Sequence, residues 1–210
     1  MKKINSPYTS ITGCTFAYYE FKRCLPLLMS DDAEKLIKDE VENNRLMQVN
    51  SQTSRYRFAL EFKRRYASVP PYFWVEWQNW SESGQRIGLF YAILKTYKIV
   101  FDFHFNVTVK KWICADNILN QGDIEMEMNE IASRDAFVNS WSDATKKKSI
   151  SCYLTMLRDS GLLEGKSNIL LHVNLDISEW AYYFRSGDLW FLDGCLLYAY
   201  EIDNIKSQLQ

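Results

Sequence analysis

The stretch SDATKKKSISCYLTMLRDSGLLEGKSNILLHV, residues 142–173, decides the fold that the sequence predicts. Ser142 is a good N-cap residue for a helix, and Gly161 readily takes the left-handed conformation that ends one. Residues 162–173 have the pattern of two short strands around a polar turn. A helix followed by such a β-hairpin predicts a winged-helix-like element.

The helix in this stretch has two different faces. One stripe is apolar and is expected to face the core: Ile150, Tyr153, Leu154 and Leu157. The opposite stripe is polar, with lysines crowding the first turns. In a DNA-reading helix, first-turn side chains approach base edges while ammonium groups meet phosphates. The predicted DNA-contacting residues of this helix are therefore Lys146, Lys147, Lys148, Ser151, Thr155 and Arg158.

A first helix-turn-helix is predicted at about residues 31–68. Apolar spacing indicates a helix over residues 32–48, a turn at 49–51 and a second helix over 51–68. On the second helix we expect Tyr56, Ala59, Leu60 and Tyr66 to point inward. The basic residues are expected to point mostly outward and to form a second DNA-contacting cluster: Arg55, Arg57, Lys63, Arg64 and Arg65.

The remaining pattern completes a mainly α protein. Pro70 and Pro71 end the second helix, and the aromatic residues that follow favour a core wedge over a base-stacking surface. Further helices are predicted over residues 83–96, 124–138, 177–184 and 188–200. We expect an N-terminal region, residues 1–122, and a C-terminal region, residues 123–210, that together form one continuous globule.

Residues 101–109 carry a conflicting signal. Phe101, Phe103 and Phe105, followed by two valines, alternate strictly with polar residues. Periodicity alone indicates a strand there.

Composition bounds the function. The net charge is -1, so a DNA-binding role cannot rest on a global positive field and must rest on local patches.

The most apolar stretch, residues 88–105, is interrupted by charged residues, so no membrane span is expected. The N-terminus has no apolar signal segment. Five scattered cysteines without a C-x-x-C spacing indicate a reducing compartment. We therefore expect a cytoplasmic protein.

Catalysis has little support in the sequence. The two histidines, His104 and His172, have no spacing that suggests a metal site or a nucleophile's partner, and each is expected to be structural. No glycine-rich phosphate or dinucleotide loop occurs, so no cofactor is predicted. The chain is predicted to bind rather than catalyse.

Two interpretations of the basic clusters stay open. The first is that both touch DNA phosphates, since counterion release rewards even local clusters. The second is that they only keep the protein soluble. In that case the chain is a protein-interaction scaffold that docks other subunits through its Trp-rich segment and its acidic C-terminal helices.

Four motifs, in order along nearly the whole chain, resemble the BrxA family of type 1 BREX (bacteriophage exclusion) phage-defence systems. They are Ile4-Asn5-Ser6-Pro7-Tyr8-Thr9-Ser10, Arg57-Phe58, Ser142-x-x-Thr145-x-Lys147 running into Leu157-x-x-x-Gly161-Leu162-Leu163, and Gly187-Asp188-Leu189-Trp190. The resemblance implies a helical monomer with helix-turn-helix elements that binds double-stranded DNA beside a methyltransferase and other BREX proteins. It implies no catalytic residues. It also implies that residues 101–109 are helical, and we adopt that expectation over the alternation.

Overall fold

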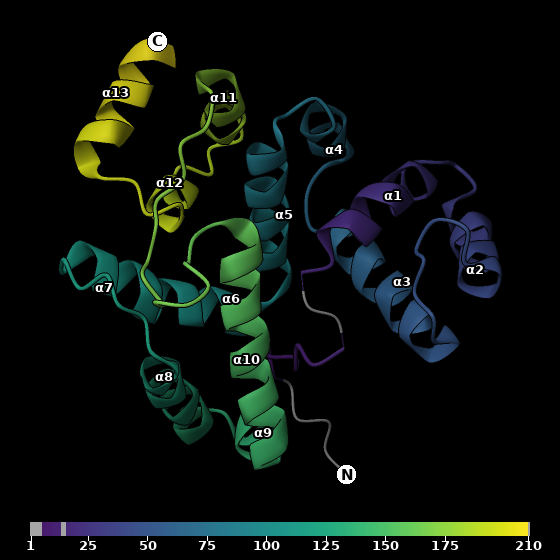
Figure 1. Ribbon diagram of the computed structural model, residues 1–210, viewed down its shortest axis with the longest axis horizontal. Helices are drawn as coiled ribbons and strands as arrows, with labels where there is room; N and C mark the ends of the chain where they lie inside the picture. The colour runs from purple at the N-terminus through teal and green to yellow at the C-terminus, as the bar shows by residue number, and fades with distance from the viewer. Residues whose placement is uncertain (1–5, 14–15, 210) are drawn as a thin grey trace.

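Helix α5 (Glu82–Thr96) runs through the middle of the computed structural model, which describes residues 6–13 and 16–209 (Figure 1). Every residue from 87 to 94 is buried. A helix that is apolar on all sides must be covered on all sides. Accordingly α3 (Gln52–Ala67) and α10 (Asp143–Ser160) both pack on α5, as does the short α4 (Pro71–Trp77).

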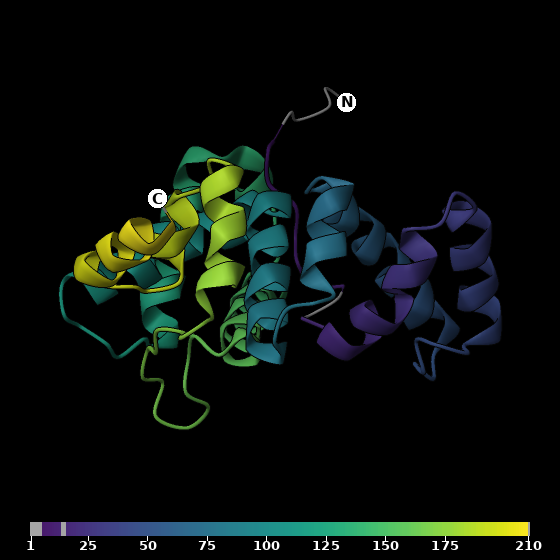
Figure 2. The same cartoon turned by 90° about the horizontal axis from the view of Figure 1, so that it is seen from above.

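The other elements extend from this centre in two directions. The helices α1 (Tyr18–Leu28) and α2 (Ala33–Asn43) join α3 at one end of the molecule, and the C-terminal helices lie at the other end (Figure 2). Besides α10, the elements after α5 are, in chain order, α6 (Lys98–Phe103), the π-helix η1 (His104–Thr108), α7 (Val109–Ile113), α8 (Gln121–Arg134), α9 (Ala136–Asn139), α11 (Ile177–Arg185), α12 (Trp190–Gly194) and α13 (Ala199–Leu209). The prediction of a mainly helical protein is confirmed.

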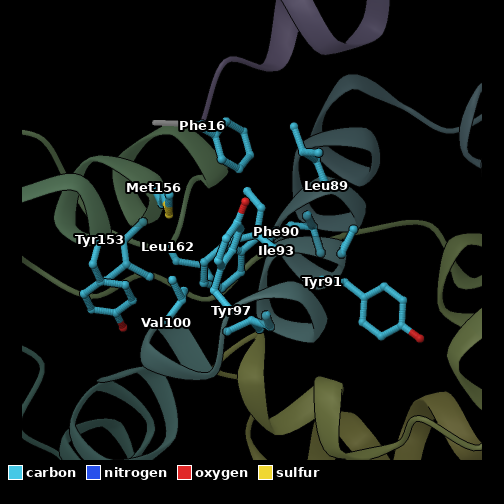
Figure 3. Close-up of a cluster of buried hydrophobic side chains, with 14 of the residues drawn as sticks. Phe16, Leu89, Phe90, Tyr91, Ile93, Tyr97, Val100, Tyr153, Met156 and Leu162 are labelled. Atoms are coloured by element: carbon cyan, nitrogen blue, oxygen red, sulfur yellow. The ribbon is translucent and has the colours of Figure 1, made fainter. Parts of the chain in front are cut away.

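The core is built largely from aromatic side chains. Phe90 on α5, Tyr153 on α10 and Phe16 from the N-terminal segment meet in one buried cluster (Figure 3). Phe73, Trp74 and Trp77 are also completely buried, so the aromatic segment after the two prolines is the core wedge that the sequence predicts.

Within the described residues, no helix is both long and apolar enough to cross a membrane.

Close approach of α11 to the start of α5 requires a glycine. The buried Glu179 carboxylate accepts a hydrogen bond from the Ser81 backbone N–H at 2.6 Å. A Cβ atom at Gly84 would overlap the Oε1 atom of this carboxylate. The glycine therefore allows α11 to seal the N-terminal end of the central helix.

The predicted β-hairpin of a winged helix is not supported. Residues 6–13 and 16–209 contain no strand, only the isolated antiparallel bridges between Leu163 and Leu170 and between Ile118 and Ile169. In the apolar run 169–173, Ile169 pairs with Ile118 on one side and Leu170 pairs with Leu163 on the other. Pairing this short does not build a strand.

The first helix-turn-helix also departs from prediction. α2 ends at Asn43, because Asn44 takes the left-handed conformation with φ of 52°. The buried Glu40 carboxylate then accepts hydrogen bonds from the backbone N–H groups of Leu46 and Met47, at 2.8 and 2.7 Å. These bonds hold residues 44–51 as a long connection, so the prediction of a helix to residue 48 and a three-residue turn is wrong.

Residues 101–109 are helical, as the family resemblance implied. The polar residues Asp102 and His104 are buried with partners rather than exposed on a strand face: Asp102 accepts a hydrogen bond from Tyr8 at 2.7 Å, and His104 lies 3.0 Å from the Tyr153 hydroxyl. The helix is therefore covered on both sides, which explains the misleading alternation.

The single helix predicted over residues 188–200 is instead two helices, because α12 stops at Gly194 and α13 begins at Ala199.

Candidate nucleic-acid interface

Helix α10 is capped at both ends as its sequence predicts. The Ser142 Oγ accepts a hydrogen bond from the Thr145 backbone N–H at 3.2 Å, and Gly161 closes the helix with φ of 90°. Without a Cβ atom, glycine adopts this conformation at no steric cost. The two caps fix where the helix begins and ends, and the N-cap thereby fixes the position of its first lysines.

The two faces of α10 are also as predicted. Ile150, Tyr153, Leu154 and Leu157 are all buried against the core. On the opposite stripe Lys147 and Ser151 are exposed and Thr155 and Arg158 are half-buried. From Lys147 to Arg158 this stripe runs about 16 Å at the helical rise of about 1.5 Å per residue. One continuous polar face of α10 is therefore open to solvent.

Three successive lysines occupy the start of this face. Lys147 and Lys148 are exposed, and their ammonium groups form no ion pair or hydrogen bond within the part of the chain that the structure describes. Lys146 is half-buried and donates a hydrogen bond to the Asn139 carbonyl at 3.4 Å. Asp143 and Glu125 share a shallow pocket with two of these lysines without pairing with them. The charge at the start of α10 thus stays available to an outside anion.

The far end of the stripe is joined to the loop that follows α10. Arg158 donates a hydrogen bond from Nη2 to the Asn168 side-chain oxygen at 3.0 Å. The loop carries the exposed Lys166, a cation that the sequence analysis did not single out. Its position in the polar turn after the helix is the signal that could have identified it. The stripe therefore has positive charge at both ends.

The basic cluster of α3 is used very differently. Arg55 is buried and donates hydrogen bonds to three backbone carbonyl oxygens, those of Val41, Val49 and Asn50, at 2.7 to 2.9 Å. Arg65 is fully buried and donates to the Phe16 carbonyl at 2.6 Å. The prediction that these two arginines point outward is wrong.

A rotation of α3 about its axis explains the error. Phe62 is completely buried against Phe21, with ring centroids 5.3 Å apart, and it turns Arg55 and Arg65 inward with it. Tyr56 and Leu60, which were expected inside, are exposed. Ala59 is buried in either orientation, so the apolar pattern of this helix did not fix its inward face.

The other basic residues of α3 are mostly paired. Lys63 forms an ion pair with Glu34 at 2.6 Å, and Arg64 forms one with Glu61 at 2.9 Å. Arg57 is exposed and forms no such contact with another described residue. Of this cluster, only Arg57 keeps its charge unpaired among the described residues.

The two basic clusters are not brought together. α3 and α10 lie on different sides of α5, α3 towards the N-terminal helices and α10 towards the C-terminal half (Figures 1 and 2). A single cationic surface made of both clusters is therefore absent. The candidate interface is the exposed face of α10 with Lys166.

The described residues hold no group of three or more His, Cys, Asp or Glu side chains that could bind a metal ion. His104 is enclosed: its Nε2 donates to the Gly194 carbonyl at 2.7 Å, and burial lowers its pKa to about 4, so it is neutral. It is the structural histidine that the sequence predicts.

Three of the cysteines are buried: Cys24, Cys152 and Cys195. Cys114 is exposed, and Cys14 lies outside the described residues.

Comparison with known proteins identifies the family. A family model described as BrxA matches residues 7–182, most of the chain. The chain belongs to the BrxA family. A BREX protein BrxA from Bacillus cereus (strain H3081.97) is 23% identical over 175 residues, which cover 81% of this chain and 88% of that protein.

The fold of this BrxA family member also occurs in a solved structure. The crystal structure of an uncharacterized protein from Magnetospirillum magneticum superposes with a TM-score of 0.76 at 20% identity and covers 91% of this chain and 98% of that chain. The likeness concerns the fold alone. The family match includes both α3 and α10, so both basic helices lie within the part shared with the BrxA family.

Proposed function

We propose that the protein is a non-catalytic component of a BREX phage-defence system that binds double-stranded DNA through the exposed face of α10. The family and the name of the Bacillus cereus relative support the place in a BREX system. The proposal that it binds without catalysing rests on the absence of a catalytic constellation from the sequence. Other proteins of the system are its expected partners.

The observation that carries the DNA proposal is the unpaired charge at the start of α10. Lys147 and Lys148 face solvent with no carboxylate partner in the described structure. Phosphates that replace the counterions of such lysines release those ions to solution, which favours binding.

The dimensions of the stripe suit a duplex. The major groove of B-DNA is about 12 Å wide, and the polar face from Lys147 to Arg158 is about 16 Å long at the helical rise. A helix lying across the groove can therefore place Lys147 near one phosphate strand and Arg158 or Lys166 near the other. Ser151 and Thr155 lie between them on the same stripe and would face the floor of the groove in this orientation.

Charge reversal on α10 tests the proposal. The variant Lys147→Glu/Lys148→Glu is expected to weaken binding to a fluorescent duplex by about tenfold or more, because it replaces attraction to two phosphates with repulsion. The matched control is Lys35→Glu/Lys38→Glu on α2, where both lysines are also exposed and form no ion pair with a described residue. This control changes net charge equally and should alter affinity less than twofold. Equal weakening in both variants, or no binding by the wild type, would refute the proposal.

A further inference from the structure

A groove of about 1010 Å³ is lined by residues of α7, α12 and α13. α7 and α13 lie at the end of the molecule away from α3 (Figure 1). Its floor includes the buried Leu170 and Leu197. Trp112 and Ile113 of α7 and Tyr198 before α13 also line the groove. Trp112 and Tyr198 are near neighbours, with ring centroids 4.9 Å apart. The lining is therefore largely apolar and aromatic.

Exposed apolar side chains concentrate around this groove. Among the described residues, twelve large hydrophobic residues are exposed, and four of them line the groove: Ile113, Leu171, Leu189 and Tyr198. Two more adjoin it, because Tyr200 stacks on Tyr198 at 5.7 Å and Ile118 pairs with the lining residue Ile169. Ile113 and Tyr200 are 73% and 70% exposed. Contiguous apolar patches of this kind mark protein interaction sites.

One stretch of backbone beside the groove, residues 168–171, already forms hydrogen bonds with two neighbouring segments. The carbonyls of Asn168 and Ile169 accept hydrogen bonds from Leu119 and Glu164, and the N–H groups of Leu170 and Leu171 donate to Asn117 and Leu162, all at 2.7 to 3.0 Å. Residues 168–171 thus lie between two paired neighbours and offer no free edge to a partner strand. Recognition at this part of the groove relies on side chains, and a helix that lays apolar residues into a groove is a mode that does so.

The charges of the groove define the partner further. Asp203 pairs with Lys206 at 3.6 Å, and His172 lies 3.6 Å from Glu201. The Asp193 side chain, in contrast, lines the groove without a hydrogen bond or ion pair to any described residue. Desolvation by neighbouring atoms raises the pKa of the exposed Asp193 carboxyl, and the charge of Lys206 opposes this effect. Covering this carboxylate with purely apolar atoms would be costly, so a complementary partner supplies a cation.

We propose that the groove between α7 and α13 binds an amphipathic helical segment of another protein, with apolar side chains against Trp112 and Tyr198 and a lysine or arginine facing Asp193. The proposal rests on the proposed function only in that the partner is sought among the proteins of the same defence system. The groove and the lysines of α10 share no residue, so the two activities are separable.

Co-purification tests the groove directly. The tagged chain is co-expressed with the other proteins of its defence system, and the complex is recovered after nuclease digestion. Ile113→Glu is expected to reduce partner recovery at least tenfold, since it places a charge in an apolar wall. Val75→Glu on α4 is the matched control, because Val75 is a β-branched residue that is also mostly exposed, and it should recover as much partner as the wild type. Circular dichroism checks that both variants are folded.

The interface itself can be mapped with p-benzoylphenylalanine in place of Tyr200. The expected cross-linked peptide, read by mass spectrometry, is a segment of another protein with apolar residues at helical spacing and a Lys or Arg. Asp193→Lys should weaken recovery, and reversing the charge of that partner residue should restore it. Recovery of no partner by the wild type, cross-links only to a second copy of this chain, or unchanged recovery with Ile113→Glu would each overturn the proposal.

Duplex affinity of Ile113→Glu separates this proposal from the proposed function. We expect it to equal that of the wild type. Lys147→Glu/Lys148→Glu should, conversely, recover partner normally. Absence of DNA binding with an intact complex would thus overturn only the DNA proposal, and absence of a complex with intact DNA binding would overturn only the groove proposal.

Discussion

Helices α3 and α10 both carry clustered positive charge, yet the protein uses that charge in opposite ways. On α3, Arg55 and Arg65 point inward and donate to backbone carbonyls. On α10, Lys147 and Lys148 point outward and remain unpaired within the described structure. The packing of Phe62 places Arg55 and Arg65 inside, and the guanidinium group tolerates burial because its five donors in a rigid fork can bond carbonyl oxygens. The ammonium of lysine is more strongly hydrated and stays at the surface of α10.

The largest expected effect is on the α3 side of this comparison. Arg65→Ala should lower the free energy of unfolding by about 4 kcal/mol, because it leaves the Phe16 carbonyl without this donor and opens a cavity at a fully buried position. Urea unfolding measures the change. Arg57→Ala on the same helix is the control and should cost less than about 0.5 kcal/mol, as exposed positions do. Equal costs would erase the proposed difference between buried and surface arginines.

The buried face of α10 predicts a pH effect nearly as large. His104 bonds Tyr153 of α10, and its pKa is lowered to about 4 in the folded protein, whereas an unfolded chain takes up the proton near 6.5. The contribution of neutral His104 to the free energy of unfolding is therefore fully present above pH 6.5. It falls by about 3 kcal/mol as the pH drops to 4. The imidazole NMR resonances of His104 report the midpoint directly.

His104→Gln supplies the control for that titration. It should be less stable at pH 7 but should lose less stability between pH 6.5 and 4 than the wild type. A His104 midpoint near 6.5 would contradict the enclosed, neutral histidine.

Arg55→Ala gives an intermediate effect. It removes the donor to three carbonyl oxygens that close residues 44–51 onto α3, so we expect the free energy of unfolding to fall by about 2 kcal/mol. Hydrogen exchange should speed up in residues 44–51 ahead of the rest of the protein. Duplex affinity should stay at the wild-type level, and a selective drop in affinity with unchanged stability would instead return Arg55 to the DNA interface.

The smallest effect concerns the cap that positions the lysines. Ser142→Ala removes the hydrogen bond to the Thr145 N–H and should cost about 1 kcal/mol. Thermal unfolding checks the cost, and Ser151→Ala, on the exposed face of the same helix, should have almost none. If both changes cost the same, the cap does not fix the start of α10.

These contrasts also show what the sequence could and could not predict. The faces and caps of α10 follow from local rules, since one stripe is clearly apolar and Ser142 and Gly161 act within a single turn. α3 has apolar residues on several sides, so its orientation is decided by packing of Phe62 on Phe21, two residues from distant parts of the chain. Local periodicity cannot contain that information.

The same limit applies to the apolar segments of the C-terminal half. Ile169 and Leu171 belong to a predicted strand, and only the fold shows that both line an open groove, with Ile169 in an isolated bridge. The buried polar residues Asp102 and His104 imitated a strand for a related reason, because their partners Tyr8 and Gly194 lie far away in sequence. Burial by distant parts of the chain is what the pattern does not record.

The salt dependence of duplex binding distinguishes α10 from α3 as the helix that contacts DNA. Binding constants measured from low to high salt should fall with a slope whose steepness drops by about 2 in Lys147→Ala/Lys148→Ala, one for each phosphate that is no longer neutralised. The slope of Arg57→Ala, the exposed arginine of α3, should equal that of the wild type. An unchanged slope in the α10 variant, together with a shallower one in Arg57→Ala, would instead place the DNA on α3.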